Sequence, residues 1–217
     1  MRDQFHEQLD SVFVELAAIC RQVETAVTRA TAALMSGDVT TAERVIDADV
    51  DIDRARERVE ESAFELLSLQ QPVAGDLRVV VAALRMVTEL ERMGDLSVHV
   101  AKIARLRVPE IAVPDAAKPT VQRMAAVAED MVARVADIIS TRDVEAAIIL
   151  GRDDEEMDQL RRTSFAELLS DDWDHGVEAA VDIALLGRYY ERIADHAVSV
   201  ANRVVFVVTG EKPTAVS

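Results

Sequence analysis

The chain has a single cysteine in 217 residues, Cys20, so it cannot form an intrachain disulfide. It contains no apolar run near the roughly 20 residues that a membrane span requires. Its first residues, Met1 to Glu7, lack the apolar segment of a signal peptide. These absences exclude a disulfide-stabilised secreted domain and direct membrane insertion, and they predict a cytoplasmic protein. Cys20 lies in an apolar helical stripe, which predicts a buried thiol in the core.

Positive charge is also scarce, with 24 basic residues against 40 acidic residues and a net charge of −16. Nucleic-acid binding needs a basic patch, and anionic membrane surfaces attract basic segments, so neither partner is expected. The charge is compatible with metal cations and with basic surfaces of protein partners. Simple solubility explains the same charge, and composition alone does not separate these alternatives.

Glycine (7) and proline (5) are rare, and Ala, Val, Leu, Arg and Glu dominate, a composition that favours long helices. Apolar residues recur at helical spacing, and no alternating run is long enough for a strand. Gly37 and Gly210 are expected helix stops, Thr40 with Glu43 a capping box, and Asp76 an N-cap. The predicted helices span residues 4–35, 40–70, 76–106, 119–140, 143–169 and 175–208.

The sequence consists of one unit of about 100 residues that occurs twice. Glu91-Arg92-Met93-Gly94-Asp95 matches Glu191-Arg192-Ile193-Ala194-Asp195 at a spacing of 100 residues, and Asp49 to Asp53 matches Asp154 to Asp158 at 105. Pro109 and Pro114 mark a linker between the two copies. We therefore predict an all-α protein of six helices in two tandem three-helix bundles, residues 1–107 and 119–217, joined by a Pro-rich linker, 108–118.

Each copy contains two acidic pairs whose carboxylates share one helix face, because their residues are four apart. Chance alone gives about seven such pairs in this composition, so the duplication carries the information. The pairs lie on partly apolar faces, where like charges repel and burial is unfavourable without a compensating cation. If neighbouring helices pack together, two pairs form one four-carboxylate cluster suited to iron, manganese, zinc or magnesium. The candidate metal ligands are Asp49, Asp53, Glu91, Asp95, Asp154, Asp158, Glu191 and Asp195.

The alternative is that nearby arginines neutralise these acids in surface ion networks. The arginines in question are Arg56, Arg85, Arg92, Arg188 and Arg192. His99, one turn after Asp95, is a possible nitrogen ligand or a surface residue. Its counterpart, Ser199, is a poor ligand, so the two sites are expected to differ.

Catalytic signatures are absent from the sequence. It has no Walker-type phosphate loop, no His-Glu-x-x-His motif and no nucleophile with an evident base. We therefore predict a protein that is not an enzyme and has no catalytic residues. The Glu-x-x-His motifs of ferritin-like di-iron proteins are also missing, which weighs against a metal-storage protein or an oxidase.

The chain resembles the PhoU family of phosphate-transport accessory proteins over essentially its whole length. The resemblance rests on Gln71-Pro72-Val73-Ala74 with Asp76-Leu77-Arg78, on the two motifs at 91–95 and 190–196, and on the closing Val208-Thr209-Gly210-Glu211. It implies two similar three-helix bundles. It also implies that the eight acids match motifs that bind multinuclear metal clusters in some members. The family usually has asparagine where this chain has His99 and Ser199, so the identity of any metal stays open.

The resemblance also implies a function. Family members link the phosphate-specific ABC transporter to the sensor histidine kinase of the phosphate two-component system, and prevent the starvation response when phosphate is plentiful. The implied partners are the transporter's ATPase subunit (PstB-like) and the PAS-containing region of the kinase (PhoR-like), and a homodimer is expected. The sequence thus predicts a metal-binding negative regulator. The alternatives are a metal-handling protein and a purely structural adaptor whose acids all form ion pairs.

Overall fold

The computed structural model describes residues 2–70, 72, 74–151 and 154–211, with the side chains of residues 2–5, 69, 70 and 154 left out. These residues form seven α-helices and no strand. The helices are α1 (Arg2–Ser36), α2 (Val39–Gln70), α3 (Gly75–Arg107), α4 (Lys118–Thr141), α5 (Val144–Leu150), α6 (Asp154–Leu168) and α7 (Gly176–Thr209).

The predicted all-α fold is confirmed. Five of the six expected helices lie within two residues of their predicted ends, because apolar residues at helical spacing mark each core-facing stripe. The expected helix over 143–169 is instead built from α5 and α6. Residues 152 and 153, between these two segments, lie outside the described residues.

The predicted glycines at the C-terminal ends of helices are confirmed, whereas the predicted N-terminal caps are wrong. Gly37 and Gly210 adopt positive φ angles of 69° and 79°, as helix-ending glycines do. The N-cap of α2 is Asp38, whose carboxylate accepts hydrogen bonds from the Thr41 amide (3.1 Å) and hydroxyl (2.6 Å). The predicted capping box at Thr40 is therefore wrong, because a competing side chain two residues earlier takes the role. Asp76 is likewise not a cap but a residue of the first turn of α3.

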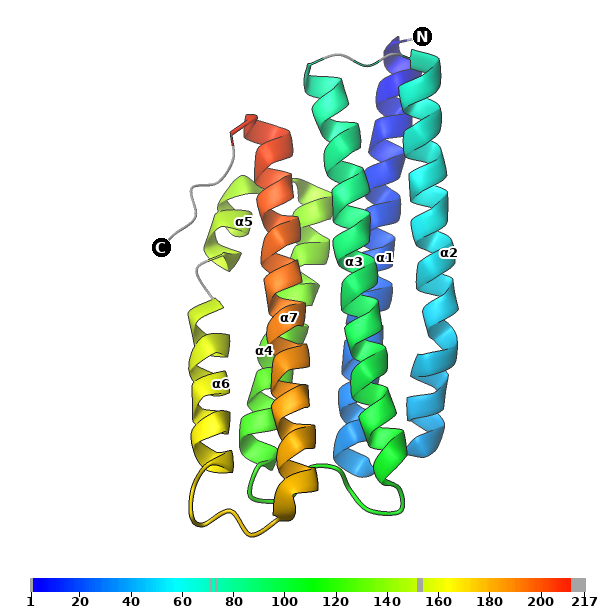
Figure 1. The fold of residues 1–217 in the computed structure, drawn as a ribbon. Helices are drawn as coiled ribbons and strands as arrows, with labels where there is room; N and C mark the ends of the chain where they lie inside the picture. Colours follow the sequence, from blue (N-terminus) through cyan, green and yellow to red (C-terminus); the bar gives the residue numbers. More distant parts are fainter. Residues whose placement is uncertain (1, 71, 73, 152–153, 212–217) are drawn as a thin grey trace.

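The helices form two adjacent bundles that pack along their length (Figure 1). Helices α1, α2 and α3 make up one bundle, and α4 to α7 make up the other. Contacts of α1 with α4 and of α3 with α7 join the bundles into one continuous buried core. Residues 108–117 connect α3 to α4, and Ala112 and Val113 within this segment are buried.

The sequence repeat is also a structural repeat. Each residue from 81 to 90 in α3 is buried, half-buried or exposed in the same way as the residue 100 positions later in α7. The predicted burial of Cys20 is confirmed, since its thiol is fully inaccessible and burial raises its pKa to about 12. Within the described residues, no helix is both apolar enough and long enough to span a bilayer.

Polar contacts also bridge the bundles. Arg107 at the end of α3 donates to the buried Asp182 of α7 at 3.0 Å and also pairs with Glu178. Glu89 of α3 lies 2.7 Å from His196 of α7, and this contact lowers the pKa of the Glu89 carboxyl. These contacts fix the register of α3 against α7, the two helices that carry the Glu-x-x-x-Asp motifs.

Candidate metal centre

The first carboxylate cluster lies between α2 and α3. Asp49 and Asp53 on α2 are half-buried, and so are Glu91 and Asp95 on α3. Burial, followed by the charges of Asp95, Asp53 and Glu91, raises the pKa of Asp49 to about 6. Asp49 therefore responds to the charges of the other three acids across the helix pair. The convergence of all four into one metal-binding group stays a prediction.

Positive charge compensates this first cluster only weakly. Arg92 lies 3.7 Å from a Glu91 oxygen and 3.6 Å from an Asp95 oxygen, beyond hydrogen-bond distance for both. Burial and the Asp95 charge still raise the pKa of Glu91. Among the described residues, Asp49 and Asp53 form no ion pair. The cluster therefore holds an excess of negative charge.

Gly94, inside the first motif, allows the two helices to approach closely beside this cluster. A Cβ atom at this position would lie 3.1 Å from Ile52 Cδ1 and 3.5 Å from Asp49 Oδ1 on α2. Glycine within a helix is unfavourable by up to about 1 kcal/mol relative to alanine, so the residue needs a reason. The reason here is the short separation of α2 and α3, which brings the acids of both helices together.

The second cluster lies between α6 and α7 and is neutralised differently. Glu191 is buried and accepts hydrogen bonds from both Arg161 and Arg188. Partial burial, then the charges of Glu191 and Asp158, raise the pKa of Asp195. Asp158 is exposed, with Arg162 at 3.8 Å. The side chain of Asp154 lies outside the described residues.

The charge around the two clusters differs. The first cluster has the uncompensated charge that a cation would neutralise, whereas arginines already pair with Glu191 in the second. Sequence reasoning included Arg188 but missed Arg161. Asp154, Asp158 and Arg161 are spaced i, i+4 and i+7, so the helical spacing that selected the acids could also have identified this arginine.

His99 faces the other bundle rather than standing free to join the first cluster. Its ring stacks on Tyr189 of α7, with ring centroids 5.2 Å apart and planes 23° apart. The corresponding residue, Ser199, is half-buried. The stacking supports the surface role for His99, and it places this residue at the contact of α3 with α7.

The chemistry of the donor set restricts what the first cluster can do. Carboxylate oxygens are hard ligands that favour magnesium, manganese, calcium or iron over soft metals. In the described part of the chain, no three His, Cys, Asp or Glu side chains already stand in a metal-binding arrangement. The acids of the first cluster fit a cation in type and charge, whereas those of the second are partly committed to arginines.

Comparison with known proteins agrees with the sequence resemblance. The PhoU domain model matches residues 16–104 and again residues 121–204. The phosphate-specific transport system accessory protein PhoU homolog 2 of Mycobacterium tuberculosis is 45% identical over 98% of this chain and 100% of that protein. The PhoU homolog of Caulobacter vibrioides is 31% identical over 97% of this chain and 92% of that protein.

Solved structures show the same fold. The crystal structure of PhoU from Pseudomonas aeruginosa matches with a TM-score of 0.86 and 27% identity, covering 95% of this chain and 100% of that one. The phosphate transport system regulatory protein from Streptococcus pneumoniae matches with a TM-score of 0.87, at 24% identity and 97% and 99% coverage. The second match supports the fold alone.

Proposed function

The chain is a member of the PhoU family, and from this premise we propose that it regulates phosphate transport. Its relatives are named accessory proteins of the phosphate-specific transport system. In the finer form of the proposal, it is a non-enzymatic negative regulator of phosphate uptake and of the starvation response. It acts, as a cytoplasmic homodimer, as an adaptor between the transporter ATPase and the sensor kinase.

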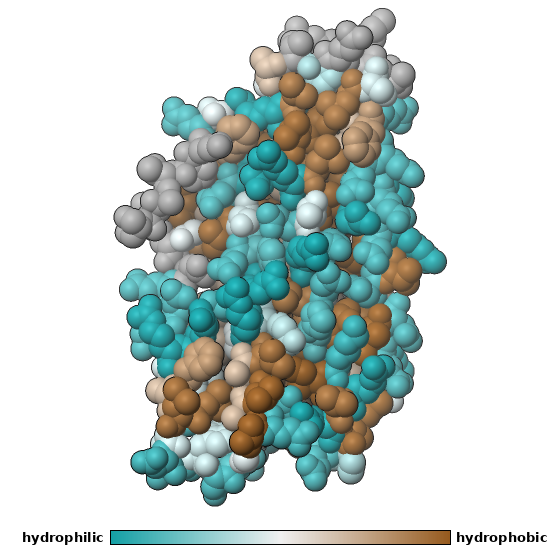
Figure 2. Space-filling view, in the orientation of Figure 1, coloured by the Kyte–Doolittle hydropathy of each residue, from teal (hydrophilic) through white to brown (hydrophobic). Residues whose placement is uncertain are grey.

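An exposed apolar surface supports the adaptor role. Val177, Val181 and Leu185 follow one face of α7 at i, i+4 and i+8, with 80%, 50% and 40% of each residue exposed. Phe165 of α6 is 41% exposed, and Leu169, which directly follows this helix, is 83% exposed. Figure 2 shows apolar side chains gathered at this end of the molecule, over the end of α6 and the start of α7. Such surfaces on soluble proteins are typical of partner-binding sites.

Charge around this apolar surface favours a basic partner. Exposed acids lie in and beside the α6–α7 connection, namely Asp171, Asp172, Asp174 and Glu178. An amphipathic helix with basic residues beside its apolar stripe would match both features, since helices commonly bind such grooves and complementary charge sets specificity. We propose that the partner proteins supply a segment of this kind.

Binding can be tested with the surface variants Val181→Asp and Leu185→Asp. Biolayer interferometry against the cytoplasmic region of the kinase, and separately against the ATPase subunit, should show at least tenfold weaker binding to one partner. Val14→Asp is the matched control, because Val14 is an exposed valine (70%) on α1, in the other bundle. Unchanged affinity of both variants for both partners would remove this surface from the proposal.

The regulatory role itself is tested in the source organism. A phosphate-responsive reporter is measured in high phosphate with and without this gene, and deletion should turn the starvation response on. If the reporter stays off, a double deletion of this gene and any paralogue separates redundancy from a wrong functional assignment. A reporter that is still off in the double deletion would overturn the negative-regulator role.

The first carboxylate cluster favours a metal-binding form of this regulator, and it also keeps the metal-handling protein as a second candidate. Four neighbouring acids suit a hard cation, since Arg92, Arg56 and Lys102 act on them only electrostatically and form no described hydrogen bond with them. Metal analysis of protein purified without chelator should find bound metal that is reduced in Asp49→Asn. Metal-free protein that still represses the reporter would favour the structural adaptor, whereas a phosphate-independent metal phenotype would favour metal handling.

A further inference from the structure

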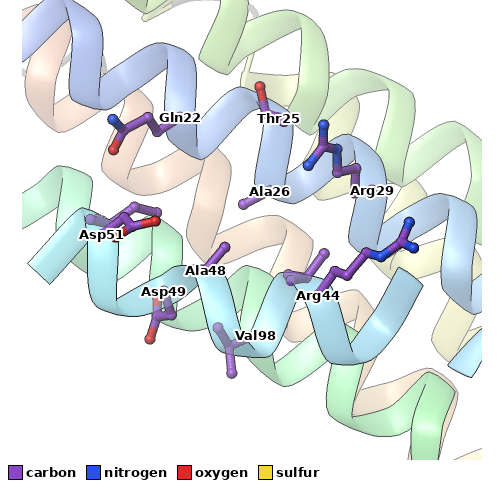
Figure 3. A pocket seen from close by; sticks show the side chains of 11 residues that line it. Gln22, Thr25, Ala26, Arg29, Arg44, Ala48, Asp49, Asp51 and Val98 are labelled. Atoms are coloured by element: carbon purple, nitrogen blue, oxygen red, sulfur yellow. The ribbon is translucent and has the colours of Figure 1, made fainter. Parts of the chain in front are cut away.

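A pocket of about 230 Å³ lies between α1 and α2 and shares only Asp49 with the first carboxylate cluster (Figure 3). Its apolar lining includes Val45 and Ile52 of α2 and Val98 of α3, all buried. Ala26 of α1 and Ala48 of α2 lie opposite each other in its middle. Small side chains at both positions leave the space open between the helices.

Two arginines from different helices line one end of this pocket. Figure 3 shows Arg29 on α1 and Arg44 on α2 at the same end, with Gln22 and Asp51 at the other. Within the described residues, neither guanidinium forms a hydrogen bond or an ion pair. Arg44 acts on Asp38 only electrostatically, as the smallest of the influences on that carboxyl.

Unpaired arginines are informative in a chain this acidic. Arg21, Arg107 and Arg161 pair with carboxylates, whereas other arginines, such as Arg85 and Arg105, share the lack of a described partner. Arg29 and Arg44 are distinguished from these because they line the same pocket. An oxyanion that lies between two guanidiniums is attracted by both positive charges. Their planar forks suit a bidentate oxyanion such as a phosphate or a carboxylate.

The opposite end of the pocket has a different polarity. Gln22 of α1 and Asp51 of α2 lie there, away from the arginines. The carboxylate of Asp51 and the amide oxygen of Gln22 can accept hydrogen bonds. This end therefore favours a ligand group that donates hydrogen bonds.

We propose that this pocket binds a compact organic oxyanion. Its phosphate or carboxylate lies between Arg29 and Arg44, its apolar body covers the floor, and a donor group at its far end reaches Gln22 and Asp51. Two arginines match the two negative charges of a phosphate monoester, so phosphate esters bind more tightly than carboxylates of the same shape. The inference does not depend on the proposed regulatory role, because it rests only on the pocket and its lining residues.

Calorimetry with a matched series of small molecules tests the two ends separately. The full chain is used after chelator treatment, because Asp49 both lines the pocket and belongs to the first carboxylate cluster. 4-Aminophenyl phosphate should bind saturably at millimolar concentration or below. Phenyl phosphate, which lacks the donor, and 4-aminobenzoate, which carries a carboxylate, should bind more weakly. Inorganic phosphate and 4-aminophenol, each with half of the required chemistry, should bind weakest.

Variants then assign the binding to these residues. Arg29→Gln and Arg44→Gln should each weaken 4-aminophenyl phosphate binding about tenfold or more, as expected for a lost charged hydrogen bond. Asp51→Asn should reduce the preference for 4-aminophenyl phosphate over phenyl phosphate. Arg162→Gln is the control of equal charge change, since this side chain on α6 is 71% exposed and far from the pocket lining.

The outcomes that overturn the proposal are distinct. Failure of wild-type protein to bind any of the phosphate esters or the carboxylate saturably would remove the site. Equal weakening by Arg162→Gln would show general charge attraction in place of a pocket. Circular dichroism of each variant confirms that the fold is intact, because both arginines are exposed and their loss should not affect the core.

Discussion

At the residue scale, Asp49 is the candidate metal ligand whose surroundings most disfavour a negative charge. It is half-buried among three other acids, and the protein would be more stable with a neutral group there. Residues retained against stability in this way are characteristic of binding sites. This interpretation leads to a stability test that needs no knowledge of the metal.

Asp49→Asn should raise the unfolding free energy of chelator-treated protein at neutral pH, by on the order of 1 kcal/mol, because like-charge repulsion is relieved. Thermal or urea unfolding measures the change. The same variant should gain less stability than wild type when manganese or magnesium is added. If the Asp49→Asn variant were less stable than wild type without metal, the carboxylate would be a structural group and not a ligand.

Asp38 gives the opposite case of an acid that stabilises the fold. The hydrogen bonds from Thr41 lower the pKa of this carboxyl below its ordinary value of 3.8. The unfolded state therefore binds the proton more readily. The contribution of Asp38 is present above its ordinary pKa and is lost as the pH falls through its lower, folded-state pKa.

The pH prediction follows from a comparison of Asp38→Asn with wild type in urea unfolding. Asparagine also caps helices, so the variant should lose little at neutral pH. The difference in unfolding free energy should shrink further as the pH falls below the ordinary pKa of aspartate. A difference that is constant with pH would show that the charge of Asp38 does not matter.

At the scale of helices, two glycines show that packing against a neighbouring helix, and not helix propensity alone, determines whether a larger side chain is tolerated. Gly94 and Gly187 are both buried residues inside long helices, but their surroundings differ. A Cβ at Gly94 would lie 3.1 Å from Ile52, whereas one at Gly187 would make ordinary contacts with Met124 at 3.6 Å and 3.9 Å.

Gly187→Ala should therefore stabilise the protein by up to about 1 kcal/mol through helix propensity. Gly94→Ala should gain clearly less, because Ile52 must move, and Gly94→Val should destabilise by about 1–3 kcal/mol through overpacking. Chemical denaturation of the three variants tests the order. Equal gains for both alanine variants would show that α2 and α3 are not held close together at Gly94.

At the scale of the whole molecule, the two repeats behave as one packed body. Helix α1 packs on α4 and α3 packs on α7, and Arg107 joins α3 to the buried Asp182 of α7. We therefore expect a single cooperative unfolding transition for the full chain, even though the sequence reads as two units. Scanning calorimetry with coincident circular dichroism is the measurement.

Arg107→Ala should lower the melting temperature by several degrees, because it leaves Asp182 buried without its partner. Arg123→Ala is the matched control, since Arg123 and Glu156 form an ion pair in which both side chains are about half exposed. The control should melt close to wild type. Two separate transitions in wild type, or equal effects of the two variants, would contradict the single-body description.

Sequence alone determined the features that depend on spacing along one helix. Helical periodicity placed five helices within two residues, because each apolar stripe must face a core. The duplication selected the acidic pairs from a chain rich in acids, and the resemblance of its motifs identified the family. Each of these inferences needs only residues that are close in sequence or repeated at a fixed offset.

Only the tertiary structure decided how charges on different helices combine. It placed Asp49 among acids of α3 but Glu191 between Arg161 and Arg188, so two similar motifs have different surroundings. It also brought Arg29 and Arg44 to one pocket, although nothing in their spacing indicates that they line the same cavity. The physical reason is that electrostatic energy depends on distance through space, which the packing of whole helices sets and local sequence does not.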